Sequence, residues 1–166
     1  MSVEPFGDRV RALRDSWIER REVKALAGAH DFESQFRLLE MLHGWTTRAA
    51  ADAAEVYGGE LELRISPRPS PAGRDAAFSV VVAEAFVLSF RLAHRQRMGT
   101  PGWFVSVSIA TTGGHGNAVM AGPERRYGQW TRGGVEDLLL TVLGAYERSL
   151  SGEGASGSEL RVRVRG

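Results

Sequence analysis

The sequence AAFSVVVAEAFVLSFRLAHR, residues 76–95, decides the fold of this chain. Large apolar side chains occupy alternate positions on both sides of Glu84, and this two-residue period is typical of a β-strand with one buried face. A single strand from Ala77 to Ala93 would span about 55 Å at about 3.3 Å per residue, which is too long for one domain of this size. The stretch must therefore bend or fold back on itself.

The face on which the apolar residues lie predicts where the chain turns. A two-residue loop would place Val82 and Phe86 on opposite faces of the sheet, whereas the three-residue loop Ala83-Glu84-Ala85 keeps them on one face. We therefore predict a hairpin with this loop, in which Glu84 faces solvent. The alternative is one bulged, strongly bent strand, in which the Glu84 carboxyl would point into the apolar face and have a raised pKa.

Two further stretches have the same period of two. They are ELELRIS, residues 60–66, and WFVSVSIA, residues 103–110, with the larger apolar residues on one face of each. Residues 67–75, PRPSPAGRD, contain three prolines, which cannot pair in a central strand and so predict a loop. A short returning strand is expected near ERRYGQW, residues 124–130.

Helical periodicity precedes and follows these strands. Apolar residues in 6–28 recur at steps of three and four, and residues 31–59 predict a longer helix that begins at an Asp31 N-cap and ends at Gly58. The apolar row of this second helix, which we expect to be buried, comprises Phe32, Phe36, Leu39, Leu42, Trp45, Ala49, Ala53 and Val56. A third helix follows Thr131, its expected N-cap, with apolar residues at i, i+3, i+4, i+7, i+8 and i+11 from Val135.

The predicted fold class is α+β. It has two N-terminal helices, an antiparallel sheet of four to five strands, and a C-terminal amphipathic helix packed on one sheet face. Residues 1–150 are expected to form one domain, followed by a Gly/Ser linker at 151–158. The alternating Arg and Val residues of 159–166 predict a terminal edge strand or a tail.

Composition excludes several classes of function. The chain has 166 residues, a net charge of +1, 43% hydrophobic residues and no cysteine, so disulfides and thiolate catalysis are excluded. The charged start of the chain and the lack of a long apolar run indicate a soluble, cytoplasmic protein. Lys24 is the only lysine, and this preference for arginine, with abundant Ala and Gly, suggests a GC-rich bacterial genome.

The glycine-rich stretch TTGGHGNAVMAGPERR, residues 111–126, is the first candidate ligand site. Val119 stands where a dinucleotide fingerprint requires its third glycine, and the stretch has no lysine for a phosphate-binding loop. We therefore favour a plain connecting loop over a ligand-contacting loop, and either of these over a catalytic His115.

An enzyme has little support in the sequence. The four histidines share no metal-ligand spacing, and no G-x-S-x-G motif is present. We therefore predict no catalytic residue, no metal site and no cofactor. An enzyme would require Glu84, His94 or His115 to converge with arginines in one pocket, and it is the least favoured hypothesis.

Two arginine clusters carry the second hypothesis, a surface that binds nucleic acid or a phosphate ligand. Arginines interleaved with aromatic residues are typical of single-strand binding surfaces, where bases stack on the rings. The candidate residues are Arg91, His94, Arg95, Arg97, His115, Arg125, Arg126, Trp130 and Arg132. The alternative is a solvated rim in which Trp130 fills the core before the last helix.

The leading hypothesis is a non-catalytic bacterial protein–protein interaction module, either a homodimer or a subunit or adaptor of a larger assembly. Trp17 and Ile18 are adjacent on the first helix and point about 100° apart, so one of them can cover a neighbouring subunit. Arg161, Val162 and Arg163 belong to the predicted edge strand, which could pair with one specific partner strand.

Overall fold

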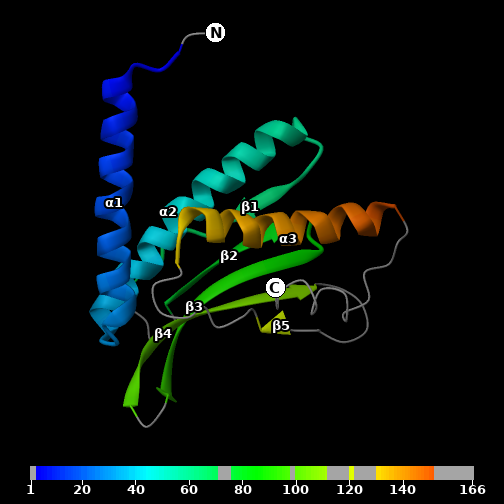
Figure 1. Ribbon diagram of the computed structural model, residues 1–166. Helices are drawn as coiled ribbons and strands as arrows, with labels where there is room; N and C mark the ends of the chain where they lie inside the picture. The colour runs from blue at the N-terminus through cyan, green and yellow to red at the C-terminus, as the bar shows by residue number, and fades with distance from the viewer. Residues whose placement is uncertain (1–2, 71–75, 98–99, 112–119, 122–129, 152–166) are drawn as a thin grey trace.

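The computed structural model describes residues 3–70, 76–97, 100–111, 120–121 and 130–151, and it confirms the predicted α+β fold (Figure 1). Two helices come first, an antiparallel sheet follows, and one helix comes last. The elements are α1 (Phe6–Gly28), α2 (Phe32–Tyr57), β1 (Leu63–Ile65), β2 (Ala77–Val82), β3 (Phe86–Arg97), β4 (Thr100–Thr111), β5 (Met120–Ala121) and α3 (Arg132–Leu150). The predicted returning strand at 124–130, except for Trp130, and the edge strand at 159–166 lie outside the described residues.

The sheet is an antiparallel meander in which the strand order follows the chain, β1-β2-β3-β4-β5. Val82 pairs with Phe86, so β2 and β3 are joined by the predicted three-residue loop and the continuous bent strand is excluded. Ala83 and Glu84 have φ of 53° and 55°, and the Ala85 amide donates to the Val82 carbonyl at 3.0 Å. This is a type I′ turn built without glycine.

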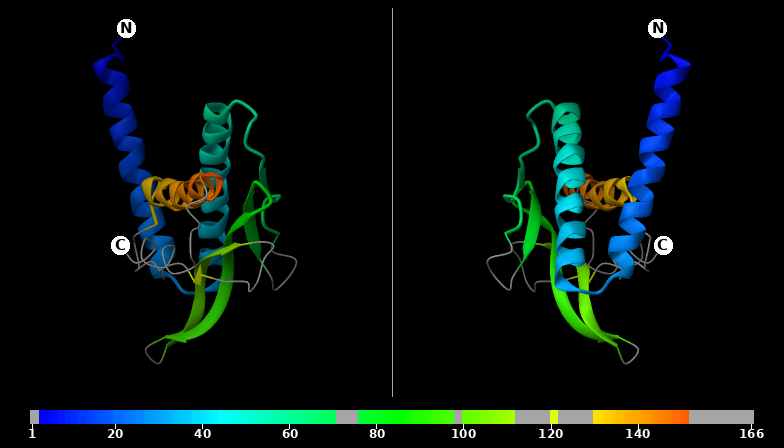
Figure 2. Two further views of the ribbon diagram at one scale, coloured as in Figure 1. Left: turned by 90° about the vertical axis from the view of Figure 1, so that its right-hand side faces the viewer. Right: turned by 90° about the vertical axis from the view of Figure 1, so that its left-hand side faces the viewer.

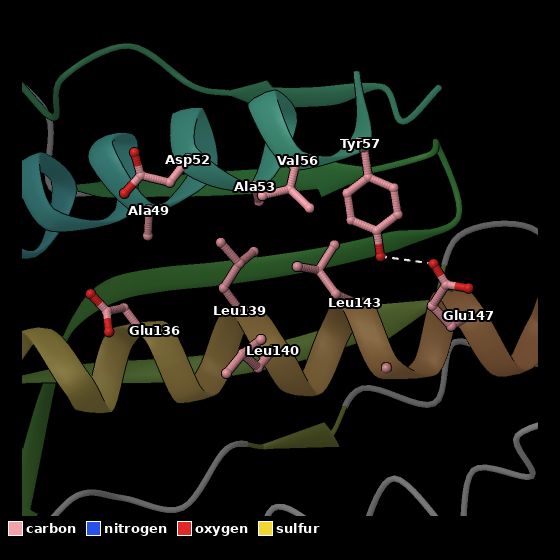
Figure 3. Close-up of a pocket in the computed structure, with 11 residues that line it drawn as sticks. Ala49, Asp52, Ala53, Val56, Tyr57, Glu136, Leu139, Leu140, Leu143 and Glu147 are labelled. Carbon is pink, nitrogen blue, oxygen red and sulfur yellow. Dashed lines mark hydrogen bonds between the residues drawn. The ribbon is translucent and has the colours of Figure 1, made fainter. Parts of the chain in front are cut away.

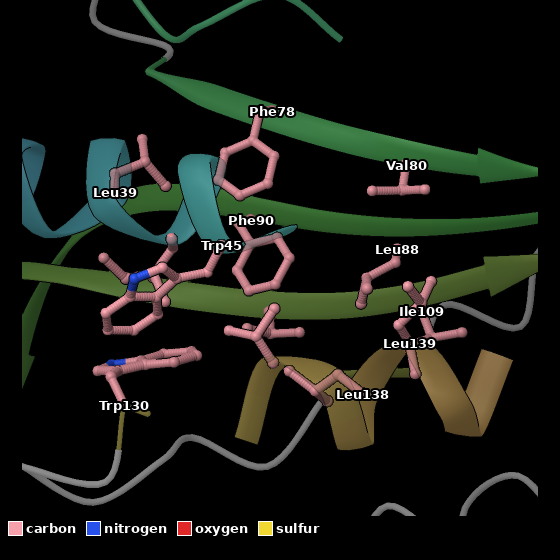
Figure 4. Close-up of a cluster of buried hydrophobic side chains, with 14 of the residues drawn as sticks. Leu39, Trp45, Phe78, Val80, Leu88, Phe90, Ile109, Trp130, Leu138 and Leu139 are labelled. Carbon is pink, nitrogen blue, oxygen red and sulfur yellow. The ribbon is translucent and has the colours of Figure 1, made fainter. Parts of the chain in front are cut away.

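One face of the sheet and the helices α2 and α3 enclose the core (Figures 1 and 4). The buried side chains of β2, β3 and β4 alternate as predicted, and Phe78 stacks on Phe90 with ring centroids 4.7 Å apart. Trp130 is 7% exposed and lies against the same cluster just before α3. The large core side chains thus come from β2, β3 and β4, from the two helices that cover them and from Trp130.

The opposite face of the sheet carries more polar side chains. Ser79, Ser89 and Ser108 are register neighbours across β2, β3 and β4. Arg91 alternates with the buried Phe90 and so belongs to this face, away from α2 and α3. The two faces of the sheet therefore differ in polarity.

The predicted helix ends are confirmed. The Asp31 carboxylate accepts the Ser34 amide at 2.9 Å, and the Thr131 hydroxyl accepts the Gly134 amide at 3.0 Å. Gly58 ends α2 in the left-handed conformation, with φ of 59°, which glycine adopts without steric cost. The prediction of a fully buried α2 row is wrong at Val56, which is 84% exposed because it faces a groove between α2 and α3.

Hydrogen bonds from α2 and from β4 hold the junction between α1 and α2 in place. The buried amide of Gln35 donates to the carbonyls of Leu26 and Ala29, at 3.0 and 2.7 Å, near the end of α1. The Trp103 amide of β4 donates to the His30 carbonyl at 2.8 Å. These contacts anchor the C-terminal end of α1 to α2 and to the sheet.

Candidate functional site

The N-terminal half of α1 stands clear of the other described elements (Figures 1 and 2). Its buried residues are Val23, Leu26 and Ala27, all in the last two turns. Residues 9–18 are exposed throughout, although they include large apolar side chains. This helix therefore projects apolar surface into solvent.

The exposed apolar residues of α1 form one stripe. Phe6, Val10, Leu13 and Trp17 are 76%, 47%, 61% and 55% exposed. Because each residue advances by about 100° around the helix axis, these four side chains fall within about 60° of arc. We call them the α1 stripe. Of the two α1 residues that the sequence analysis singled out, Trp17 belongs to the stripe, while Ile18, 50% exposed, points about 100° away from Trp17.

Arginines flank the α1 stripe on both sides. By the same helical arithmetic, Arg9 and Arg20 lie on one side of it, and Arg14 and Arg21 lie on the other, all of them exposed. Lys24 follows Trp17 by seven residues and so continues the line of the stripe. The stripe is thus an apolar surface with a basic border.

The acidic side of α1 faces the body of the protein. Asp8, Asp15, Glu19 and Glu22 lie opposite the stripe on the helix. The guanidinium of Arg132, at the start of α3, donates to both carboxylate oxygens of Glu19 at 2.8 Å, and Arg37 of α2 donates to Glu22 at 3.5 Å. These contacts orient α1 so that the stripe is turned outward.

The ion pair between Glu19 and Arg132 shifts the pKa of each group away from its ordinary value. The hydrogen bonds from Arg132 lower the pKa of Glu19, and the same contact raises the pKa of Arg132. The guanidinium also lies over the ring of Trp45, 5.7 Å from its centroid. The guanidinium of Arg132 is therefore held by contacts with Glu19 and Trp45 of the same chain.

A groove of about 570 Å³ runs between α2 and α3 on their outer side (Figure 3). We call it the α2–α3 groove. Its lining is mainly apolar, and Val56 and Leu140 are 84% and 63% exposed there. The lining residues are Ala49, Asp52, Ala53, Val56, Tyr57, Glu136, Leu139, Leu140, Leu143, Gly144 and Glu147.

Among the described residues that line the α2–α3 groove, every charged one is acidic. These are Asp52 from α2, and Glu136 and Glu147 from α3. The Tyr57 hydroxyl donates to the Glu147 carboxylate at 2.8 Å, which closes one end of the groove and raises the pKa of Tyr57 (Figure 3). The groove is an apolar surface with an acidic border.

The arginine clusters of the second hypothesis do not gather on one surface among the residues that the structure describes. Arg91 and Arg95 are exposed on strand β3, with Arg91 on the face away from the helices, whereas Arg132 lies on the helical side of the sheet. Trp130 is buried, so its ring faces are covered. His115, Arg125, Arg126 and the side chain of Arg97 lie outside the described part of the chain.

Histidines and carboxylates are dispersed in the same way. His94 contacts the ring of Trp103 at a centroid distance of 5.2 Å, and the exposed Glu84 pairs with Arg64 at 2.9 Å. His43 contacts the Ser66 carbonyl at 3.0 Å. Within the described ranges, no group of three or more histidine or acidic side chains is placed to hold a metal ion. No described helix combines the length and apolar character needed to cross a membrane.

Of the α1 stripe, only Trp17 was predicted from the sequence as an interface residue, and the groove was not predicted. Of the other predicted interface residues, Arg161, Val162 and Arg163 lie outside the described residues. Comparison of the chain with protein-family models, with curated proteins and with solved structures finds no match. A function for this chain must therefore be inferred from its own structure.

Proposed function

We propose that this chain is a non-catalytic protein–protein interaction module of the bacterial cytoplasm, and that the α1 stripe is its contact surface. The exposure of Phe6, Val10, Leu13 and Trp17 on a helix that projects from the body is the observation that carries this proposal. Large contiguous apolar patches on a soluble chain mark interaction sites. Trp17 in the stripe and the arginines along its border are of the residue types that dominate binding energy in protein interfaces.

Two further observations support the proposal. Glu19 and Glu22 hold the acidic side of α1 toward the body, so the stripe is presented at a fixed angle. A presented helix loses less conformational freedom on binding than a free segment would. The preference for arginine and the lack of cysteine in the sequence support the bacterial and cytoplasmic parts of the proposal.

The test compares two variants of α1 that have the same chemical change. Leu13→Glu places a charge within the stripe, and Ile18→Glu places the same charge on an exposed position outside it. Tagged wild-type chain and both variants are used to capture partners from the cytosol of the source organism at low and moderate salt. Self-association of each purified chain is measured in parallel by light scattering.

We expect wild-type chain and Ile18→Glu to associate with a protein, either a second copy or another chain, in a stoichiometric complex that survives moderate salt. Leu13→Glu should lose at least nine tenths of that complex. If Leu13→Glu behaves as wild type in both assays, the α1 stripe is not a contact surface and the proposal is wrong. Capture of nucleic acid that washes off with salt, equally by all three chains, would instead favour the arginine clusters.

A further inference from the structure

The α2–α3 groove and the α1 stripe are complementary in charge. The stripe is apolar with Arg9, Arg14, Arg20 and Arg21 along its sides. The groove is apolar, and its charged lining residues are acidic. Opposite charges at the borders of two apolar surfaces set the register of docking and speed the encounter.

The two surfaces also match in length. The stripe runs from Phe6 to Trp17, and the α3 wall of the groove runs from Glu136 to Glu147. Each interval is eleven residues of helix, or about 17 Å at about 1.5 Å per residue. An amphipathic helix that lays its apolar face in a groove is a common form of peptide recognition, with contacts spaced at three and four residues.

The α1 stripe does not meet the groove of its own copy. The contacts of Glu19 with Arg132 and of Glu22 with Arg37 hold the acidic side of α1 against the body, and the stripe faces the opposite way. Among the described residues, α1 therefore leaves the groove of its own copy available to a helix from another molecule.

Direct pairing of two stripes is disfavoured by charge. A seam formed by Phe6, Val10, Leu13 and Trp17 would place Arg9, Arg14 and Arg21 at its flanking positions in both helices. Such positions set partner choice in helix pairs through opposite charges, and here they would bring arginines together. The charged residues that line the groove are acidic instead.

We propose that the α1 stripe of one copy binds in the α2–α3 groove of a second copy, an inference that rests on the proposed function. In a twofold arrangement, each copy donates one stripe and receives another, and the assembly closes as a dimer. Reciprocal exchange doubles the buried surface, which matters because stable interfaces bury roughly 1,600 Å² in total.

The test uses sedimentation velocity on purified full-length chains across a range of concentrations. Leu140→Arg places a positive charge in the groove, and Leu150→Arg makes the same change on α3 outside the groove. The two leucines are 63% and 64% exposed, so both variants are expected to fold as wild type. Thermal melting of each chain checks that they do.

We expect wild type and Leu150→Arg to form dimers, and Leu13→Glu and Leu140→Arg each to raise the dissociation constant at least tenfold. Mixing Leu13→Glu and Leu140→Arg in equal amounts should restore association. The mixed pair keeps one intact contact, between the stripe of the Leu140→Arg chain and the groove of the Leu13→Glu chain.

Three results would overturn the inference. Wild type could remain monomeric at all concentrations, Leu140→Arg could associate as wild type does, or the mixture could stay dissociated. If Leu13→Glu alone abolishes association, the stripe remains a contact surface and only the groove is wrong. If wild type instead binds vesicles of anionic lipid through the stripe and forms no dimer, the occupant is a membrane surface.

Discussion

The carboxylate of Glu19 accepts two hydrogen bonds from the guanidinium of Arg132, each 2.8 Å long, across 113 residues of sequence. The contact joins the middle of α1 to the first turn of α3. Paired with the contact of Glu22 to Arg37, it decides which side of α1 faces the body and which side is left for a partner.

This ion pair predicts a pH dependence of stability. The folded-state pKa of Glu19 lies below its ordinary value of 4.5 because of the Arg132 contact. The unfolded chain therefore binds the proton more readily, so the stabilisation is present above about pH 4.5 and is lost as the pH falls through the folded-state pKa. Glu19→Gln should cost up to about 1 kcal/mol at pH 7, as expected for a partly exposed pair.

Urea unfolding of wild type and Glu19→Gln between pH 3 and 7 measures this effect. The difference in unfolding free energy between the two should shrink toward zero at the acidic end. Glu22→Gln is the control at pH 7, where its longer contact of 3.5 Å predicts a smaller loss. A difference between wild type and Glu19→Gln that stays constant with pH would contradict the prediction.

Gln35 is predicted to be essential for the anchoring of α1. Gln35→Leu removes the donor shared by the carbonyls of Leu26 and Ala29 and should cost about 1–3 kcal/mol. Gln35→Glu should cost more at pH 7, because a buried carboxylate would face those carbonyl oxygens without a proton to donate. Burial raises the pKa of an introduced carboxyl, so this extra cost should decrease as the pH falls.

Denaturant unfolding of the three chains at pH 7 and pH 5 tests this order. Gln35→Leu should lose the same stability at both values of pH, while Gln35→Glu should partly recover at pH 5. Equal stability of Gln35→Glu and wild type at pH 7 would show that the amide is not a required donor.

Gly102 is predicted to tolerate no side chain. A Cβ atom there would lie 2.6 Å from the Cβ of His30 and 3.3 Å from its carbonyl oxygen, so Gly102→Ala should push the α1–α2 junction away from β4. The expected cost is about 1–3 kcal/mol. The matched control is Gly44→Ala within α2, where a Cβ atom meets nothing within 4 Å. Because alanine favours a helix more than glycine does, this variant should stabilise the protein by up to about 1 kcal/mol. Thermal melting should shift in opposite directions for the two variants.

The type I′ turn is predicted to gain stability from glycine. Ala83 has φ of 53°, a conformation that costs an L residue roughly 1–2 kcal/mol, and glycine removes most of that cost. Ala83→Gly should therefore stabilise by about 0.5–1 kcal/mol after the greater entropy of the unfolded chain is subtracted. Ala85→Gly, at a position without positive φ, should destabilise by a similar amount. Urea unfolding that ranks Ala85→Gly as the more stable variant would refute the turn assignment.

The fold was largely predictable because its signals are local. Val82 and Phe86 lie on the same face of the sheet, a requirement that can be stated from neighbouring residues alone, and this was enough to place the three-residue loop. Asp31 and Thr131 cap the helices that follow them through contacts only three residues long. The long-range contact of Glu19 with Arg132 has no such local signal.

The candidate site was less predictable because it depends on how distant elements meet. Val56 and Leu140 read as ordinary apolar positions, and only the packing of α2 beside α3 exposes them in a groove. The α1 stripe does have a sequence signal. Phe6 and Trp17 fall on a different side of the helix from Leu26, so α1 has two apolar faces and only one can belong to its own core.

Lys24 is exposed on α1, one heptad after Trp17, and it carries the only lysine side-chain amine in the chain. An amine-reactive fluorophore therefore labels one side chain, on the line of the stripe, together with the N-terminal α-amine, and no mutation is needed to create an attachment point. Its emission would report the polarity around α1 directly, so occupancy of this helix can be followed in real time in the wild-type protein.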